Sequence, residues 1–408
     1  MKVNQLFALA AIVCCSVFTV FAQTWTQAGL PDSQWKCFAS SADGRTLAAQ
    51  PGYPYNSFIF ISTNGGATWN TNNSPTFFIP GYGPYPIPFT SIATSADGTK
   101  MAGAYVGGVI CTSTNSGTTW TTNNVPSAKW YSIASSADGN RLTAVAGNGN
   151  PAGPIYISTN SGGTWLPTSA PSNYWRSVAS SADGAKLLAG SGGGPIPNYV
   201  STNSGNTWIP TSLPTNKQWT VACSADGNKM VAAYYTDSPS IPGHIFTTTD
   251  SGSTWVSNQF ASSYFQSVAL SADGNKIVAG TQDAVVYIST NFGLSWVSNS
   301  LPGGGSGLYF QSVASSADGG KLITGSLFGQ TAFISQSIYS PQMNLTPLPT
   351  NLVLSWIIPS TNFVLQQSSD MTDWADLTNA PVLNLTNLQN QVTLPLSASN
   401  GFFRLKTP

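Results

Sequence analysis

The stretch ISTNSGGTW, residues 157–165, decides the fold, because the chain repeats it with small changes. Five further copies begin at Ile61, Thr112, Val200, Thr247 and Ile288, and we call all six the box segments. In each copy an Asn or Asp side chain can hydrogen-bond the backbone ahead of it, and a Gly can adopt a positive φ without steric cost. Each box segment therefore predicts a tight turn between two strands.

A second motif, SADG, runs in phase with the box segments. It begins at spacings of 54, 41, 45, 43, 47 and 45 residues, from Ser41, Ser95, Ser136, Ser181, Ser224, Ser271 and Ser316. Asp-Gly is a strong hairpin signal, and the segments on either side, such as 175–181, have the pattern of short strands. A period near 45 residues with four strands per unit predicts an all-β fold, a seven-bladed β-propeller.

The seventh blade lacks a box segment of its own. The copy expected from Phe333 reads FISQSIYS and contains neither Gly nor Trp. A further Thr-Trp pair, like those that end the box segments, stands instead at Thr24-Trp25. We predict that this N-terminal segment forms the outer strand of blade seven and pairs with residues 331–335, which leaves no open sheet edge in the ring. The alternative is a decayed repeat beside an accidental Thr-Trp.

Composition narrows the class of protein. Only 7% of the 408 residues are charged and the formal net charge is zero, which argues against a nucleic-acid partner. Aromatic residues make up 12%, too many for a disordered chain. All fourteen acidic residues are Asp. A helix-rich protein would rarely omit Glu, a good helix former.

The first 22 residues have the pattern of a cleaved secretory signal, with Lys2 before an apolar core at 6–21. We therefore expect a secreted, periplasmic or cell-surface bacterial protein without a membrane span after cleavage; an uncleaved anchor is the alternative. The later cysteines Cys37, Cys111 and Cys223 are odd in number and widely spaced, and His244 is the only histidine. This pattern predicts buried free thiols, with no metal and no cofactor.

The domain organisation follows from where the repeats stop. We expect the propeller over residues 23–340, a Pro-rich linker over 341–350 and a small β-sandwich over 351–408. The sequence NFVLQQSSDMTDWADLTN with the ending FFRLK resembles small C-terminal modules of secreted bacterial proteins. That resemblance covers residues 348–408 and implies no activity.

The box segments resemble the Asp-box, or bacterial-neuraminidase-type, repeat over residues 23–340. Asn stands in place of Asp in every copy except that of Asp250. The resemblance implies propeller blades with the box between the third and fourth strands. Sialidases, xyloglucan hydrolases, sorting receptors and photosystem II assembly factors share such repeats, so a function does not follow from it.

In this architecture the SADG turns and the box segments share one face. We call the opposite face, where strand two joins three and strand four joins the next blade, the loop face. A sialidase binds its substrate carboxylate with three arginines and needs a Glu. Here Glu is absent, Arg45 and Arg141 follow SADG turns, and Arg404 lies in the C-terminal module, which leaves only Arg176 near the loop face. Sialidase activity is therefore excluded.

A two-carboxylate hydrolase remains open. The loop-face acids are Asp32, Asp237 and Asp283, and Asp237 and Asp283 fall in adjacent blades with His244 near them. A pair of carboxylates across a cleft is what glycoside hydrolysis requires. The alternative is that these are solvated loop residues.

Aromatic residues are the other feature of the loop face. One set recurs at the start of strand one and would serve as stacking platforms or as packing between blades. A second set lies in the long segments 50–58 and 72–89, where length beyond structural need indicates function. We predict a binding patch formed by Tyr53, Tyr55, Phe77, Phe78, Tyr82 and Tyr85. The leading prediction is non-catalytic binding of a protein or polysaccharide, and the alternative is a xyloglucanase-like hydrolase using Asp237 and Asp283.

Overall fold

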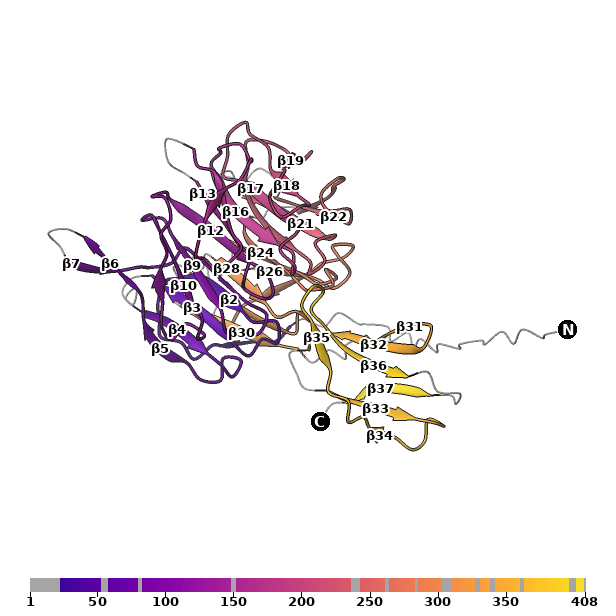
Figure 1. Cartoon of the computed structure of the whole chain (residues 1–408). Helices are drawn as coiled ribbons and strands as arrows, with labels where there is room; N and C mark the ends of the chain where they lie inside the picture. The colour runs from indigo at the N-terminus through magenta and orange to yellow at the C-terminus, as the bar shows by residue number, and fades with distance from the viewer. Residues whose placement is uncertain are drawn as a thin grey trace.

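The chain folds into seven four-stranded antiparallel sheets followed by a smaller β module (Figure 1). The computed structural model describes residues 23–52, 58–79, 83–147, 152–235, 243–260, 264–282, 285–302, 310–326, 331–337, 342–359, 363–395 and 401–406. The predicted all-β, seven-bladed propeller is confirmed.

Six blades are continuous in sequence, and each runs from an inner to an outer strand. Blades one to three are β2 (Trp35–Ser40), β3 (Leu47–Pro51), β4 (Phe58–Ser62) and β5 (Asn70–Asn73); β8 (Ser91–Thr94), β9 (Met101–Tyr105), β10 (Val109–Ser113) and β11 (Thr121–Thr122); β12 (Trp130–Ser135), β13 (Leu142–Ala146), β14 (Ile155–Ser158) and β15 (Leu166–Pro167). Blades four to six are β16 (Trp175–Ser180), β17 (Leu187–Ser191), β18 (Tyr199–Ser201) and β19 (Ile209–Pro210); β20 (Gln218–Cys223), β21 (Met230–Tyr235), β22 (Gly243–Thr248) and β23 (Val256–Phe260); β24 (Phe265–Leu270), β25 (Ile277–Thr281), β26 (Val285–Ser289) and β27 (Val297–Ser300).

Blade seven is assembled from both ends of the ring. Its inner strands are β28 (Phe310–Ser315), β29 (Lys321–Ser326) and β30 (Ala332–Gln336), and its outer strand is β1 (Trp25–Gln27). β1 runs antiparallel to β30, with Trp25 opposite Ser335 and Gln27 opposite Phe333. Trp25 is buried in the core between blades six and seven. The predicted N-terminal closure is confirmed.

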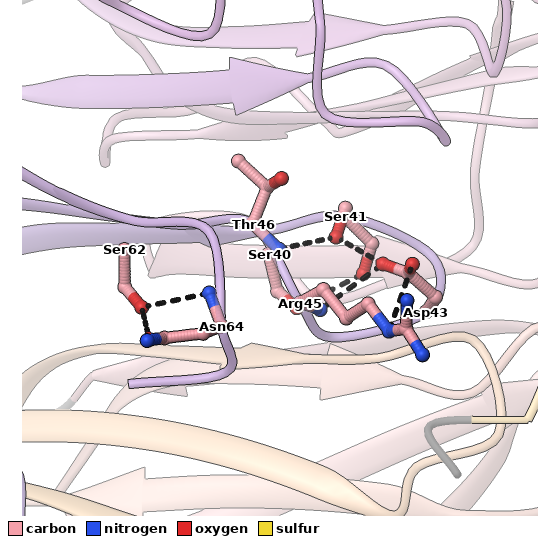
Figure 2. A network of polar contacts seen from close by, with 7 residues as sticks. All are labelled: Ser40, Ser41, Asp43, Arg45, Thr46, Ser62 and Asn64. Carbon is pink, nitrogen blue, oxygen red and sulfur yellow. Dashed lines mark hydrogen bonds and ion pairs between the residues drawn. The ribbon is translucent and has the colours of Figure 1, made fainter. Parts of the chain in front are cut away.

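The SADG turn and the box segment of each blade are joined, which places them on one face. The backbone N–H of Ser161 in a box segment donates to the carbonyl of Asn140 in the SADG turn of the same blade at 2.8 Å. Figure 2 shows the pair in blade one, where Ser41 Oγ donates to Asp43 Oδ1 at 2.6 Å and Ser62 Oγ donates to Asn64 Oδ1 at 2.9 Å. Short-range side-chain bonds therefore build both turns.

The inner strands are tied to one another around the axis. The second residue of each SADG turn is Ala, and its N–H donates to the carbonyl of the same Ala in the next blade at 2.7–2.9 Å. The last of these bonds runs from Ala317 to Ala42 and completes a circle of seven bonds. We call this set the alanine circle: Ala42, Ala96, Ala137, Ala182, Ala225, Ala272 and Ala317. It narrows the axial channel at its SADG end.

After the propeller come two small sheets that pack on each other around Leu354, Trp356 and Leu365. One sheet consists of β31 (Asn344–Pro347), β32 (Asn351–Ile357), β36 (Gln389–Pro395) and β35 (Val382–Asn384); the other consists of β34 (Ala375–Asp376), β33 (Val364–Ser368) and β37 (Phe402–Lys406). β31 lies in the segment expected to be a linker and pairs with β32. We call residues 342–406 the C-terminal module.

One further hairpin stands outside the blades. β6 (Thr76–Ile79) and β7 (Gly83–Pro86) form a two-stranded sheet between blades one and two. In Figure 1 this hairpin projects from the propeller on the side away from the C-terminal module. The segment 72–89 was expected to be an irregular loop, and this expectation is wrong because Thr, Phe and Ile favour extended backbone on one arm. We call β6 and β7 the loop-face hairpin.

Candidate functional site

The loop-face hairpin is the part of the predicted binding patch that the structure describes. Tyr85 lies on β7, and 44% of its surface is exposed. Its neighbourhood includes Tyr105 of blade two, whose pKa is raised by burial and by the proximity of Tyr85. An exposed aromatic ring held on a strand is a preorganised contact surface.

The structure places the other predicted site residues less completely. Phe77 and Phe78 lie on β6, where the backbone alone is described. Five residues lie outside the described ranges: Tyr53, Tyr55, Tyr82, Asp237 and Asp283. The structure therefore does not bring Asp237 and Asp283 together or hold them apart, and the two-carboxylate hydrolase stays a prediction.

The two edges of the loop-face hairpin differ in their backbone groups. Ile87 N–H donates to the carbonyl of Pro75 at 2.8 Å, which makes these residues a hydrogen-bonded pair. Because such pairs alternate along an antiparallel ladder, Phe77 and Tyr85 form the next one. The prolines on either side of Tyr85 therefore face the outer edge of β7, where they offer no N–H.

The outer edge of β6 is not blocked in this way. By the same alternation, the N–H and C=O groups of Thr76 and Phe78 point away from β7. In the part of the chain that the structure describes, β7 is the only strand paired with β6. An unblocked strand edge of this kind can accept one more strand from another chain.

The aromatic side chains at the start of strand one have a structural role. None of the seven is more than 1% exposed: Trp35, Phe89, Trp130, Trp175, Trp219, Phe265 and Phe310. Several meet an aromatic of strand three edge to face, such as Trp130 on Tyr156 with ring centroids 5.4 Å apart. Trp130 also shares a core with Ala102 and Ala104 of blade two, so packing between blades is confirmed, and the buried rings are closed to a ligand.

An arginine near the loop-face end of an inner strand joins three neighbouring blades. Arg176 on β16 donates to Gln218 Oε1 of blade five at 3.0 Å and to Gln266 Oε1 of blade six at 3.3 Å. Arg176 thus lies near the loop face, as predicted, and links blades four, five and six.

Sequence reasoning missed an aromatic cluster in blade five. The Nδ1 atom of His244, on β22, lies 2.8 Å from Ser257 Oγ. The imidazole stacks on the rings of Tyr234 and Phe246, with ring centroids 5.7 and 5.9 Å apart. Lys217 Nζ lies 5.1 Å above the Tyr234 ring. Burial and the nearby Lys217 lower the pKa of His244, so the imidazole stays neutral at pH 7. The sequence contained the signal in Tyr234, His244 and Phe246, but His244 was considered only as a neighbour of Asp237 and Asp283.

The opposite face is stabilised by its own charges. Lysines that follow the SADG turns reach the next blade, as Lys100 Nζ does to Asn140 Oδ1 at 2.7 Å and Lys321 Nζ does to the carbonyl of Gly65 at 2.9 Å. Arg45 lies 3.9 Å from Asp43 on this face, as Figure 2 shows. The SADG aspartates are turn residues, as predicted, and they do not form a catalytic carboxylate cluster.

The three cysteines after residue 22 lie in three different blades. Cys37, Cys111 and Cys223 are free thiols in blades one, two and five. Burial raises the pKa of Cys37 and of Cys223 to about 12. Among the described residues, no three His, Cys, Asp or Glu side chains come together as metal ligands. No helix in those same residues has the length and apolar character needed to cross a membrane.

No family model matches the sequence, and no curated protein matches it. Several solved propellers match the fold. YCF48 bound to a D1 peptide aligns with a TM-score of 0.57 at 13% identity and covers 79% of this chain and 99% of its own. Hydrazine synthase of Kuenenia stuttgartiensis aligns with a TM-score of 0.59 at 14% identity, over 76% and 97%.

A third solved structure is that of a xyloglucanase. The GH74 xyloglucanase of Xanthomonas campestris aligns with a TM-score of 0.57 at 13% identity and covers 82% of this chain. This chain spans 59% of the xyloglucanase chain. At such identities the three likenesses show a shared propeller fold, and the functions of those proteins do not transfer with it.

Proposed function

We propose that this protein is a secreted, non-catalytic binding propeller whose loop face, around the loop-face hairpin, recognises an extended segment of another protein. The observation that carries the proposal is the hairpin itself. It is additional to the four strands of blades one and two, and it presents Tyr85 and the unblocked edge of β6. Segments that exceed structural need tend to carry function.

A protein segment fits this surface better than a glycan does. An extended chain can add to the edge of β6 through backbone hydrogen bonds, while an aromatic ring supplies apolar contact beside it. A glycan would contact only the aromatic ring of Tyr85 and would leave the backbone groups at the edge of β6 unused. The solved YCF48 complex, a propeller bound to a peptide, is a precedent for a peptide ligand on this fold. Membership of the Asp-box family and export through the N-terminal signal belong to the same proposal.

The binding experiment compares two exposed tyrosines. Mature wild-type protein is screened on peptide and glycan arrays, and affinity for the best ligand is measured for Tyr85→Ala and Tyr174→Ala. Tyr174 is the matched control, since it is 40% exposed and precedes an inner strand of blade four. We expect Tyr85→Ala to weaken binding by about 1–3 kcal/mol and Tyr174→Ala to leave it within error. Equal losses in both variants would contradict a site at the hairpin.

The hydrolase alternative predicts a different result. Wild-type protein would release reducing sugar from xyloglucan, and Asp237→Asn or Asp283→Asn would abolish the release. Under the binding proposal neither substitution affects the peptide ligand. Turnover that vanishes in either Asp variant would replace the binding proposal with the hydrolase.

A further inference from the structure

The C-terminal module lies against the SADG end of the axial channel. Ile358 packs on the alanine circle and is only 9% exposed, and Ile357, Leu383 and Leu388 pack against the same cluster. These four residues come from two places in the module: Ile357 and Ile358 lie at the end of β32, Leu383 lies on β35, and Leu388 directly precedes β36. The alanine circle thus has an apolar partner within its own chain.

The backbone of the module is shaped for this contact. Leu388 has a φ of 56°, in the left-handed region that favours glycine or asparagine. Its carbonyl accepts a hydrogen bond from Ile358 N–H at 3.0 Å, which joins the two residues that pack on the alanine circle. A bulky side chain is costly at this φ. Leu388 holds this conformation while its side chain packs against the alanine circle.

A cavity of about 150 Å³ lies beneath Leu388. Its wall consists of the alanine circle and the residues just before and within the SADG turns, among them Ser40, Ser135, Ser180 and Cys223. Among the described residues of the module, Leu388 alone lines the cavity. Serine and threonine side chains alternate with alanines in this wall, and a cavity of this size can hold several water molecules or one small solute.

We propose that the C-terminal module is the stopper of the axial channel, with Ile358 and Leu388 seated on the alanine circle so that they seal this cavity from the SADG side. The role follows from three independent features: the apolar seat of seven alanines, the left-handed Leu388 and the cavity wall that Leu388 completes. The inference does not depend on which ligand the loop face binds.

The chain contains its own reporter for this proposal. Cys223 lines the cavity, whereas Cys37 and Cys111 lie in the cores between blades. Full-length mature protein is treated with N-ethylmaleimide at pH 8, and labelling of each cysteine is followed by mass spectrometry. The test variants are Ile358→Asp and Leu388→Asp. The matched control is Val382→Asp, on β35 of the same module, where the side chain is 71% exposed.

We expect Cys223 to label at least tenfold faster in both test variants than in wild type or Val382→Asp, while Cys37 and Cys111 stay unlabelled. Rapid labelling of Cys223 in wild type, or equal rates in all variants, would overturn the proposal. Labelling of all three cysteines would indicate an unfolded variant. In that case the double variant Ile358→Ala/Leu388→Ala, which removes both side chains without adding charge, is tested in their place. It too should label Cys223 at least tenfold faster than wild type while Cys37 and Cys111 stay unlabelled, and a rate equal to that of wild type would overturn the proposal.

Discussion

At the scale of single residues, the turns of this protein rest on a few polar side chains used repeatedly. In the box segment of blade three, Asn160 Oδ1 accepts from Thr164 N–H at 2.8 Å, while its amide Nδ2 donates to Thr164 Oγ1 at 3.1 Å. In blade five, Asp250 takes the same place and accepts both bonds from Thr254, at 2.9 and 2.7 Å. Asn and Asp therefore build the same turn, but the bond to the Thr hydroxyl changes direction: Asn160 donates to it, whereas Asp250 accepts from it.

This difference predicts a pH effect that, among the six box segments, belongs to Asp250 alone. Hydrogen bonds from Thr248 and Thr254 lower the pKa of Asp250 from 3.8 to about 2. A carboxyl group with a lowered folded pKa stabilises the fold above its unfolded pKa and loses that contribution as the pH falls through the folded value. Wild type should therefore lose this contribution between about pH 4 and pH 2, and Asp250→Asn should not.

The measurement is the difference in melting temperature between wild type and Asp250→Asn from pH 7 to pH 2. The other carboxyl groups titrate in both proteins and cancel. At pH 7 the variant should melt close to wild type, since five other blades use Asn. A difference that stays constant across the acid range would show that the bonds to Asp250 do not favour its charged form.

At the scale of elements, the strand that closes the ring, β1, is one of the shortest in the propeller. β1 has three residues, but it supplies the outer edge of blade seven and buries Trp25 to 5% exposure. Gln23 N–H donates to Asn299 Oδ1 of blade six at 2.8 Å, which fixes the start of this strand. The closure of the ring therefore depends on residues far from their partners in sequence.

Deleting residues 23–27 should destabilise the whole propeller. The loss of the buried Trp25 alone costs about 3–5 kcal/mol, and β30 would be left with an open edge. The free energy of unfolding, measured with denaturant, checks this expectation. Gln27→Ala is the control, because Gln27 lies on the same strand with an exposed side chain. An unchanged unfolding midpoint after the deletion would mean that β1 does not close the ring.

At the scale of the whole molecule, the ring holds its blades at fixed separations and so keeps the thiols apart. Cys37 Sγ lies 3.6 Å from the carbonyl of Phe89, and Cys111 and Cys223 lie in two other blades. Because a disulfide requires Cα atoms within about 7 Å, pairing between blades would need the blades to move. Cys37 and Cys111 share the core between blades one and two as free thiols on strands of different blades, and Cys223 is a free thiol in blade five.

The mature protein should accordingly contain no internal disulfide. Alkylation of unfolded, non-reduced protein should label Cys37, Cys111 and Cys223 in full, as read by mass spectrometry. The same protein reduced before alkylation is the control and should give an identical mass. A crosslink between any two of the three cysteines would be incompatible with their positions in the ring.

Much of the architecture was predictable from the sequence because it rests on local chemistry. The SADG turns and box segments are built by contacts within five residues, such as Ser41 with Asp43 and Asn64 with Thr68. The regular alternation of these two motifs along the chain therefore predicts the blades. The closure by Trp25 was also predictable, since counting the repeats left one outer strand missing.

The site was less predictable, and the reason is physical. A propeller does not require the loop-face hairpin, so no period indicates whether the segment 72–89 folds as a loop or as strands. The strand-start aromatics gave two interpretations, and only the approach of neighbouring blades decided that Trp130 and its equivalents are buried.

The sequence by itself determined the repeat, the turn chemistry and the number of blades, because each depends on neighbours along the chain. Only the tertiary structure brought the seven alanines of the SADG turns into one hydrogen-bonded circle and placed Ile358 and Leu388 on it. Every copy of the motif displays the alanine. Its partner in the next blade lies 41 to 54 residues away along the chain, or at the other end of the ring, and only the closed ring brings the two together.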